Sequence, residues 1–151
     1  MICAKDIMST EVVTVGPDTR LTELARTMLD ADVSGVPVVT EDGVLLGMVT
    51  ETDLIESQQK LHMPTVIALF DAVVYVESSK HFEEKVRKAA ASTARELMQS
   101  PAVTIAPDTP LADVAEMMSR KKVHHLPVVA GGKLVGIVGK ADVVRGIGMG
   151  A

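Results

Sequence analysis

VSGVPVVTEDGVLLGMVTETDLI, residues 33–55, decides the fold of this chain, because residues 123–144 repeat it as VHHLPVVAGGKLVGIVGKADVV. The repeat extends towards the N-terminus of each copy. AKDIM at 4–8 returns as ARELM at 94–98, and VTVGPDT at 13–19 returns as VTIAPDT at 103–109. An internal repeat is the first feature to consider in a sequence, because two copies of one unit generally pack on each other. We therefore expect two units face to face, with a ligand cleft between them.

Each copy shows the same order of strand and helix signals. A short β-prone run, 12–15 or 103–105, is followed by Pro-Asp-Thr, whose Asp or Thr can cap the next helix. Helical spacing of apolar residues then gives two matching stripes: Leu21, Leu24, Ala25, Met28 and Leu29, and Leu111, Val114, Ala115 and Met118. Two strands joined by a glycine-bearing turn follow, at 36–40 and 44–49, and at 126–130 and 133–138.

A short helix is expected to begin near Asp53 in the first copy and near Asp142 in the second. The order β-α-β-β-α, twice, predicts an α/β fold, an α+β sandwich of two repeats related by pseudo-twofold symmetry. We place the first repeat at 1–56, a connecting segment at 57–92 and the second repeat at 93–151.

The connecting segment differs in character from both repeats. It holds all three aromatic residues of the chain, and its second half, 79–91, reads as a solvated helix with Glu-to-Lys/Arg pairs at i, i+4. The apolar half, Met63–Val76, is either a buried connection or a surface for self-association. It is too short, and too interrupted by Pro64 and Asp71, to span a bilayer.

Composition excludes several classes of function. A net charge of −5 argues against a broad nucleic-acid or membrane surface, so any bound anion must be held locally. No export signal is visible, and the single Cys3 fits a reducing cytoplasm. Four histidines and one cysteine show no metal-ligand spacing, and neither a phosphate loop nor a nucleophile elbow occurs. We expect no metal and no catalysis.

The functional residues are expected where the last strand of a copy meets its last helix. In GMVTETD, residues 47–53, the glycine permits close approach of a ligand to the backbone, and Thr50 and Asp53 can point into one cleft. A carboxylate can accept both hydroxyls of a ribose, and a threonine hydroxyl can bond to sugar or phosphate. The alternative is that Asp53 only caps the last helix.

These motifs, in this order and duplicated, resemble the CBS (cystathionine β-synthase) domain pair, also called a Bateman module. The resemblance implies that Gly-h-h-Thr-x-x-Asp, where h is apolar, binds the ribose of AMP, ADP, ATP or S-adenosylmethionine, a role that falls on Thr50 and Asp53. It also implies a disc-shaped homodimer and a regulated partner protein in trans. The second copy keeps Asp142 but has Gly139 in place of the threonine, which puts a second ribose site in doubt.

The copies also differ in charge before their second strand. Asp30, Asp32, Ser34 and Gly35 align with Arg120, Lys122, His124 and His125. The resemblance implies that basic residues here contact the phosphate of a nucleotide held by the other copy, and adenine would lie on aliphatic side chains. The expected nucleotide site is Thr50, Thr52, Asp53, Val12, Val36, Pro37, Lys122, His124, His125, Lys140 and Asp142. Without the resemblance, a half-exposed histidine pair at a strand start is the favoured interpretation of His124 and His125.

Three functions follow from these patterns. The first is a cytoplasmic regulatory module that senses an adenosine ligand in the cleft. The second is a ligand-free pair that serves dimerisation or assembly, with Met63–Val76 as its interface. The third, an enzyme acting on a nucleotide, lacks a general base and a nucleophile beside Thr50 and Asp53.

Overall fold

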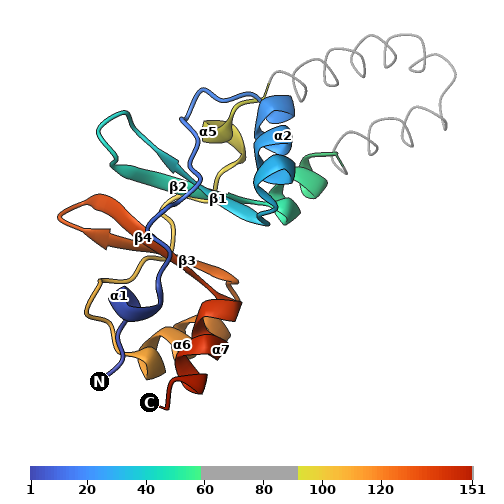
Figure 1. The fold of residues 1–151 in the computed structure, drawn as a ribbon. Helices are drawn as coiled ribbons and strands as arrows, with labels where there is room; N and C mark the ends of the chain where they lie inside the picture. The colour runs from blue at the N-terminus through green and yellow to red at the C-terminus, as the bar shows by residue number, and fades with distance from the viewer. Residues whose placement is uncertain (59–91, 151) are drawn as a thin grey trace, which may run out of the picture.

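The computed structural model describes residues 1–58 and 92–150. Predictions for Met63–Val76 and for the helix at 79–91 lie outside these residues. Two similar halves stack on each other, each with a pair of strands turned towards the other half and helices on the outside (Figure 1). The α+β sandwich predicted from the repeat is confirmed.

The larger elements follow the predicted order in both repeats. In the first repeat they are α2 (Leu21–Ala31), β1 (Gly35–Val39), β2 (Leu45–Thr50) and a helical stretch at 51–58. In the second repeat they are α6 (Leu111–Lys121), β3 (His125–Ala130), β4 (Lys133–Gly139) and α7 (Lys140–Gly148). A four-residue helix precedes each set: α1 (Ala4–Ile7) and α5 (Ala94–Leu97).

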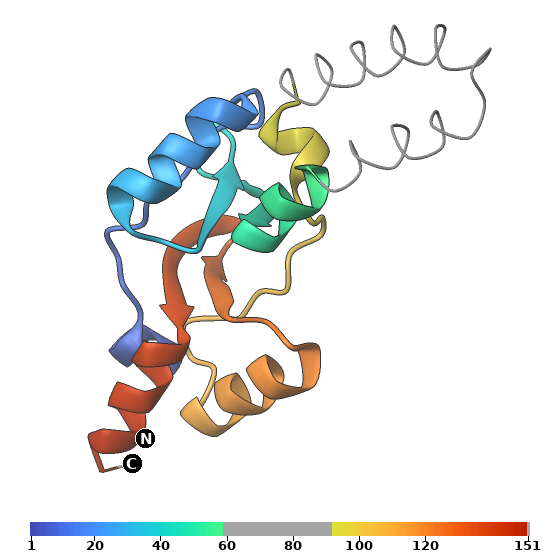
Figure 2. The same cartoon turned by 90° about the vertical axis from the view of Figure 1, so that its right-hand side faces the viewer.

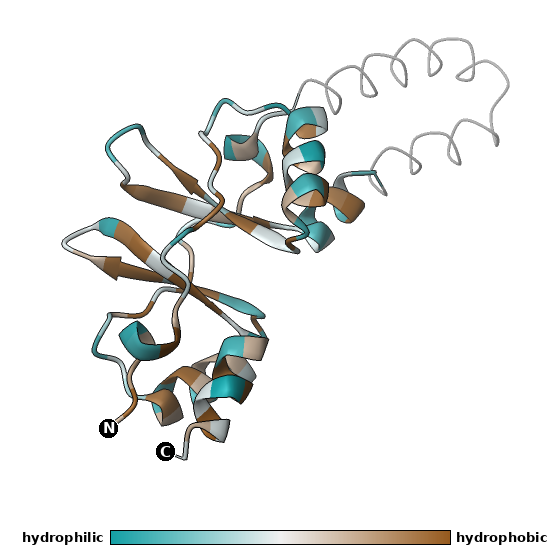
Figure 3. Ribbon diagram, in the orientation of Figure 1, coloured by the Kyte–Doolittle hydropathy of each residue, from teal (hydrophilic) through white to brown (hydrophobic). Residues whose placement is uncertain are grey.

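Each strand pair is an antiparallel hairpin, and the two hairpins share one register. Gly35 pairs with Thr50 and His125 pairs with Gly139, and both ladders are irregular at the same place, Val38/Val39 and Val128/Val129. The hairpins are largely apolar and lie next to each other at the centre of the molecule (Figure 3). The Gly43 carbonyl accepts a hydrogen bond from the Leu134 amide at 3.0 Å, which ties one hairpin to the other.

Two local expectations differ from the structure. The β-prone runs before α2 and α6 form only single-residue parallel bridges, Val15 with Val38 and Ile105 with Val128. The Pro-Asp-Thr motifs do not cap the helices, whose N-cap residues are Arg20 and Pro110 without side-chain cap bonds. The threonine carbonyls are engaged elsewhere, since Thr19 and Thr109 accept backbone bonds from Ala94 and Ala4 at 2.8 Å.

Those bonds show that the two repeats exchange their first short helices, α1 and α5. Helix α1, at the start of the first repeat, packs beside α6 and α7 of the second, whereas α5 packs beside α2 of the first (Figures 1 and 2). Ala4 and Ile7 belong to the buried cluster of the second repeat, and Ala94 belongs to that of the first. Each short helix therefore completes the core of the other copy and locks the two halves together.

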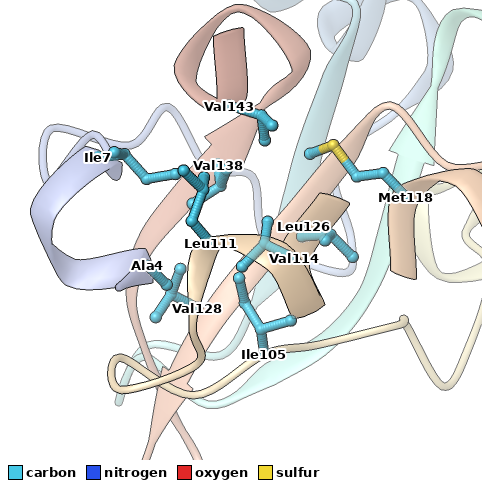
Figure 4. Packing of buried hydrophobic residues seen from close by; sticks show 10 residues of the cluster. All are labelled: Ala4, Ile7, Ile105, Leu111, Val114, Met118, Leu126, Val128, Val138 and Val143. Atoms are coloured by element: carbon cyan, nitrogen blue, oxygen red, sulfur yellow. The ribbon is translucent and has the colours of Figure 1, made fainter. Parts of the chain in front are cut away.

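The two cores are built from equivalent aliphatic positions. The second cluster contains Ala4, Ile7, Ile105, Leu111, Val114, Met118, Leu126, Val128, Val138 and Val143 (Figure 4). The first contains Val15, Leu24, Met28, Val36, Val38, Val49 and Ala94. Valines dominate the strands because β-branched side chains pack well on a pleated surface, and each fully buried one contributes about 1.5–3 kcal/mol.

Gly47 in β2 and Gly136 in β4 leave room for the chain segments that follow the exchanged helices. A Cβ on Gly47 would lie 2.7 Å from the Gln99 carbonyl oxygen, and one on Gly136 would lie 2.5 Å from the Met8 sulfur. The chain that follows each exchanged helix therefore occupies the space that a side chain would need. The prediction that Gly47 leaves room for a ligand is wrong, because the connection after α5 fills that room.

Candidate functional site

A pocket of about 280 Å³ opens between the repeats, and we call it the inter-repeat pocket. The connection after α5 passes from the first repeat to the second (Figure 2), and its residues Gln99, Pro101, Ala102 and Val103 line this pocket. Its walls come from the end of β2, from that connection and from the start of β3. The lining residues are Met48, Thr50, Thr52, Gln99, Pro101, Ala102, Val103, Lys121, Lys122, Val123, His124, His125 and Pro127.

Five of the residues predicted for nucleotide binding meet in this pocket. They are Thr50, Thr52, Lys122, His124 and His125. The hydroxyl-bearing residues come from the first repeat and the basic ones from the second, as expected for a site shared between the copies. Among the described residues, neither Lys121 nor Lys122 takes part in an ion pair, so both cations are available to an anion.

Asp53 lies behind Thr50 and does not line the pocket. One carboxylate oxygen accepts bonds from the Thr50 backbone amide at 2.8 Å and the Thr50 hydroxyl at 3.1 Å, and the other accepts from the side-chain amide Nε2 of Gln99 at 3.1 Å. This carboxylate thus fixes the start of the helix at 51–58 and joins the two repeats. The capping role that the sequence offered as an alternative is present in the structure.

His125 connects the repeats at the floor of the pocket. Its Nε2 lies 2.8 Å from the Ser34 hydroxyl, and its ring covers Gly35 so closely that a Cβ there would be 3.1 Å from Nδ1. Burial lowers the pKa of His125 below its ordinary value, and His124 lowers it further, while Glu51 acts in the opposite direction. His125 is therefore neutral at pH 7, and fixed positive charge in the pocket comes from the lysines.

The remaining predicted residues lie away from the inter-repeat pocket. Val36 and Pro37 are buried in the first repeat. Asp142 accepts bonds from the Gly139 amide and from Arg145, each at 2.8 Å, and so repeats the capping role of Asp53. Lys140 lines a different cavity, of about 510 Å³ between α6 and α7, and Val12 is half-buried outside the lining of the inter-repeat pocket.

The apolar wall of the pocket comes from residues that the sequence analysis did not choose. Ala102 aligns with Val12, and Pro127 aligns with Pro37, so the structure uses the second-repeat counterparts of the predicted residues. Val103 and Val123 complete this wall. The exchange of α5 is the cause, because it carries Gln99–Val103 past the threonines of the first repeat.

Two further properties bear on the class of site. Within 1–58 and 92–150, no cluster of three or more His, Cys, Asp or Glu residues could hold a metal ion. None of the helices in the same ranges is long and apolar enough to cross a membrane.

The architecture, two β-hairpin repeats with exchanged first helices around a shared pocket, defines a tandem-repeat module. The CBS domain family model matches residues 4–60 and 94–148, and the chain belongs to that family as a tandem pair. The CBS domain-containing protein YhcV of Bacillus subtilis is 30% identical over 142 residues, which cover 94% of this chain and 83% of that protein.

Solved structures show the same fold. CBSX2 of Arabidopsis thaliana, in complex with AMP, superposes with a TM-score of 0.78 at 23% identity, over 99% of this chain and 98% of that chain. A CBS domain pair in complex with 5′-methylthioadenosine and S-adenosyl-L-methionine gives a TM-score of 0.74 at 23% identity, over 100% and 99%. At this identity the likeness establishes the fold of the pair.

Proposed function

We propose that this chain is a regulatory module that binds an adenosine nucleotide or S-adenosylmethionine in the inter-repeat pocket. The observation that carries the proposal is the mixed chemistry of the pocket lining. The lining combines the hydroxyl-bearing Thr50 and Thr52 with aliphatic side chains such as Val103 and Val123, and its basic residues are Lys121, Lys122, His124 and His125. Sugar, base and phosphate each need one of these three kinds of side chain. The two solved CBS pairs with adenosine ligands support the choice of ligand class.

The size of the pocket agrees with a small nucleotide. Pockets for small molecules span about 300–1,000 Å³, and this one, at about 280 Å³, lies just below that range. The base would lie against Val103 and Pro127, and the absence of aromatic residues from the lining leaves specificity to backbone hydrogen bonds. The phosphate would then face Lys121 and Lys122.

Asp53 supplies the link between binding and a change in packing. A ribose that bonds to this carboxylate must compete with the Gln99 amide, which already occupies one oxygen at 3.1 Å. Gln99 also pairs with Met48 of β2 through backbone bonds of 2.9 and 3.1 Å. A ligand would thus act on the contact that holds the connection after α5 to the first repeat.

We propose that the module acts by changing its contacts with other protein chains and not by catalysing a reaction. No residue of the inter-repeat pocket is assigned a catalytic role, and the change in packing would be transmitted to a second copy and to a partner protein in trans. Cytoplasmic location and a homodimer belong to the same proposal. The assembly alternative remains a prediction, because its proposed interface, Met63–Val76, lies outside the described residues.

A thermal-shift screen against AMP, ADP, ATP and S-adenosylmethionine, with GTP as control, tests this function. A ligand at 100 times its dissociation constant stabilises the folded state by about 2.7 kcal/mol, which raises the melting midpoint by several degrees. Asp53→Asn should weaken binding at least tenfold because the ribose loses a charged acceptor.

Asp6→Asn is the matched control. Asp6 accepts a bond from the Cys3 amide at 2.8 Å, the same capping bond at the same distance as that between Asp53 and Thr50. Cys3 is not a lining residue of the pocket, whereas Thr50 and Gln99, the partners of Asp53, both line it. The control variant should keep wild-type affinity. Equal ligand shifts in Asp53→Asn and Asp6→Asn, or no shift with any adenosine ligand, would contradict the proposal.

A further inference from the structure

The four larger helices lie at the side of the molecule opposite the hairpin turns (Figure 1). Helices α2 and 51–58 belong to the first repeat, α6 and α7 belong to the second, and Figure 2 shows all four together. Apart from Met1, the five most exposed large apolar residues of 1–58 and 92–150 lie on these helices or at the C-cap of α7. They are Leu29, Ile55, Val144, Ile147 and Met149. Apolar residues gathered on one side of a molecule are typical of a contact with another molecule.

A cavity of about 510 Å³ lies between two of these helices, and we call it the α6–α7 cavity. Its apolar lining includes Met118 and Val143, which are buried in the core of the second repeat, and Val144, which is 67% exposed. Ser119 contributes a small side chain to the lining, and Lys140 contributes a positive charge. The cavity can therefore accept an apolar side chain whose neighbours are acidic.

Leu29 of α2 is a suitable side chain for such a cavity. It is 78% exposed, although the other leucines of the same helix, Leu21 and Leu24, are buried. Leu29 aligns with Ser119, so the first repeat carries a large apolar residue at the position where the second repeat has a small residue beside its cavity. The two repeats are therefore complementary in shape at this position.

The helices of the two repeats also carry opposite net charge. Residues 21–32 and 51–58 include six acidic and one basic residue, a net charge of −5, whereas residues 111–122 and 140–148 include three acidic and five basic residues, a net charge of +2. A contact between unlike repeats of two molecules joins opposite charges, and a contact between like repeats joins charges of the same sign. Charge therefore favours a contact between unlike repeats.

Two charged positions near Leu29 show this complementarity residue by residue. Arg26 and Asp30 on α2 align with Glu116 and Arg120 on α6, and all four side chains are exposed. Both signs are reversed between the repeats, while the buried positions of the two helices match. Within α6, Glu116 and Arg120 lie 3.9 Å apart, and an exposed pair of this kind contributes little to stability. A second molecule with the reversed pattern would pair with both residues.

We propose that two copies of this chain associate head to tail, with Leu29 of each copy in the α6–α7 cavity of the other. The first repeat of one copy then meets the second repeat of its partner, and the twofold axis makes this contact twice. Because the contacting helices are copies of one unit, aligned positions lie opposite each other, so that Leu29 faces the partner's Ser119. A head-to-head dimer would instead place Leu29 against the partner's Leu29 and leave both cavities unfilled.

This dimer rests on the homodimer of the proposed function, gives it an interface and an orientation, and requires no nucleotide. Sedimentation equilibrium of the whole chain without nucleotide, over a range of protein concentrations, measures its dissociation constant. Leu29→Ala should raise that constant about 100-fold, because each of the two lost contacts is expected to cost about tenfold.

Val44→Ala is the control for the loss of an exposed apolar side chain. Val44 is 39% exposed but lies in the turn between β1 and β2, away from the four helices. Its truncation should leave the dissociation constant at the wild-type value. Both side chains are exposed in the single chain, so both variants should fold, which circular dichroism checks.

Cross-linking determines the orientation of the dimer. Thr22 on α2 and Ala112 on α6 are aligned, exposed and uncharged, so a cysteine at either position leaves the charge pattern intact. In a Cys3→Ser background, the Thr22→Cys and Ala112→Cys variants carry tags of different mass and are treated with a short bismaleimide. An equimolar mixture should give the mixed cross-linked dimer, and each variant alone should give little product.

The outcomes separate the dimer from ligand binding. A chain that stays monomeric would show that something other than a second copy covers this side, and would refute the proposal. A dimer insensitive to Leu29→Ala, or a Thr22→Cys variant that cross-links to itself more than to Ala112→Cys, would refute it as well. None of these results bears on the nucleotide site, because Leu29 does not line the inter-repeat pocket and the thermal-shift screen measures binding there independently.

Discussion

The two repeats share one backbone plan and carry opposite charge on it. The hairpin registers coincide, and the buried valines of β1 and β2, Val36, Val38 and Val49, have fully buried counterparts in the second repeat. The basic residues Lys122, His124 and His125 that line the pocket align with Asp32, Ser34 and Gly35, which are acidic or small, in the first repeat. The apolar pattern thus determines the fold, which both repeats share. The positions that are not buried can differ, so each repeat can contribute different side chains to ligand binding.

A second difference concerns how firmly each exchanged helix is held. Ile7 of α1 is 1% exposed and packs in the second core, and Arg145 of α7 donates to its carbonyl at 2.9 Å. Its counterpart, Leu97 of α5, is only half-buried against the first core. The first repeat therefore depends less on the exchanged helix than the second repeat does.

Truncation of these two side chains gives the largest expected effect. Ile7→Ala should cost about 2–5 kcal/mol of unfolding free energy, because it opens a cavity in a fully buried site. Leu97→Ala should cost less than about 2 kcal/mol, because its side chain already touches solvent. Urea denaturation of both variants measures the difference. Equal losses would show that the two exchanges are energetically equivalent and would break the comparison.

The pH dependence of stability provides a smaller effect. The pKa of His125 is lowered in the folded protein by burial and by His124, against the opposing effect of Glu51, so the unfolded chain binds this proton more readily. The stability that His125 contributes is thus present above its ordinary pKa, near 6.5, and is lost as pH falls towards the lower folded value.

Denaturation midpoints of wild type and His125→Gln at pH 7.5, 6.5 and 5.5 check this sign. The advantage of wild type should be largest at pH 7.5 and should shrink with acidification, since protonation also disturbs the bond to Ser34. Gly35 occupies the matching position of the first repeat and cannot titrate, which assigns the effect to the second repeat. An advantage that grows at pH 5.5 would contradict the account.

Most of the fold could be predicted from local patterns. Helical spacing places the starts of α2 and α6 correctly, at Leu21 and Leu111, and falls two or three residues short of their ends, while the paired β-prone runs locate both hairpins. The exchange of α1 and α5 could not be predicted in this way. AKDIM and ARELM carry nearly the same apolar pattern, so either helix fits either core, and only the tertiary path of the chain decides between them.

Part of the candidate site could be predicted from the sequence, mainly where the two copies carry different residues. The motif at 47–53 indicates Thr50, and the charge difference from Ser34 and Gly35 indicates His124 and His125, and the structure brings these three residues into one pocket. The sequence does not indicate Ala102 and Pro127, because they resemble their counterparts Val12 and Pro37. Lys140 lies outside the inter-repeat pocket, in the cavity between α6 and α7, and no local pattern records how those two helices are placed.

The most direct test of ligand binding between the repeats is an amide NMR titration of the whole chain with ATP. The largest changes should fall on Thr50, Thr52 and the stretch 121–125, which belong to opposite repeats but line one pocket. Val36, in the core of the first repeat, should change little. Changes confined to one repeat, or spectra that stay the same at saturating ATP and AMP, would contradict a nucleotide site shared by the two copies.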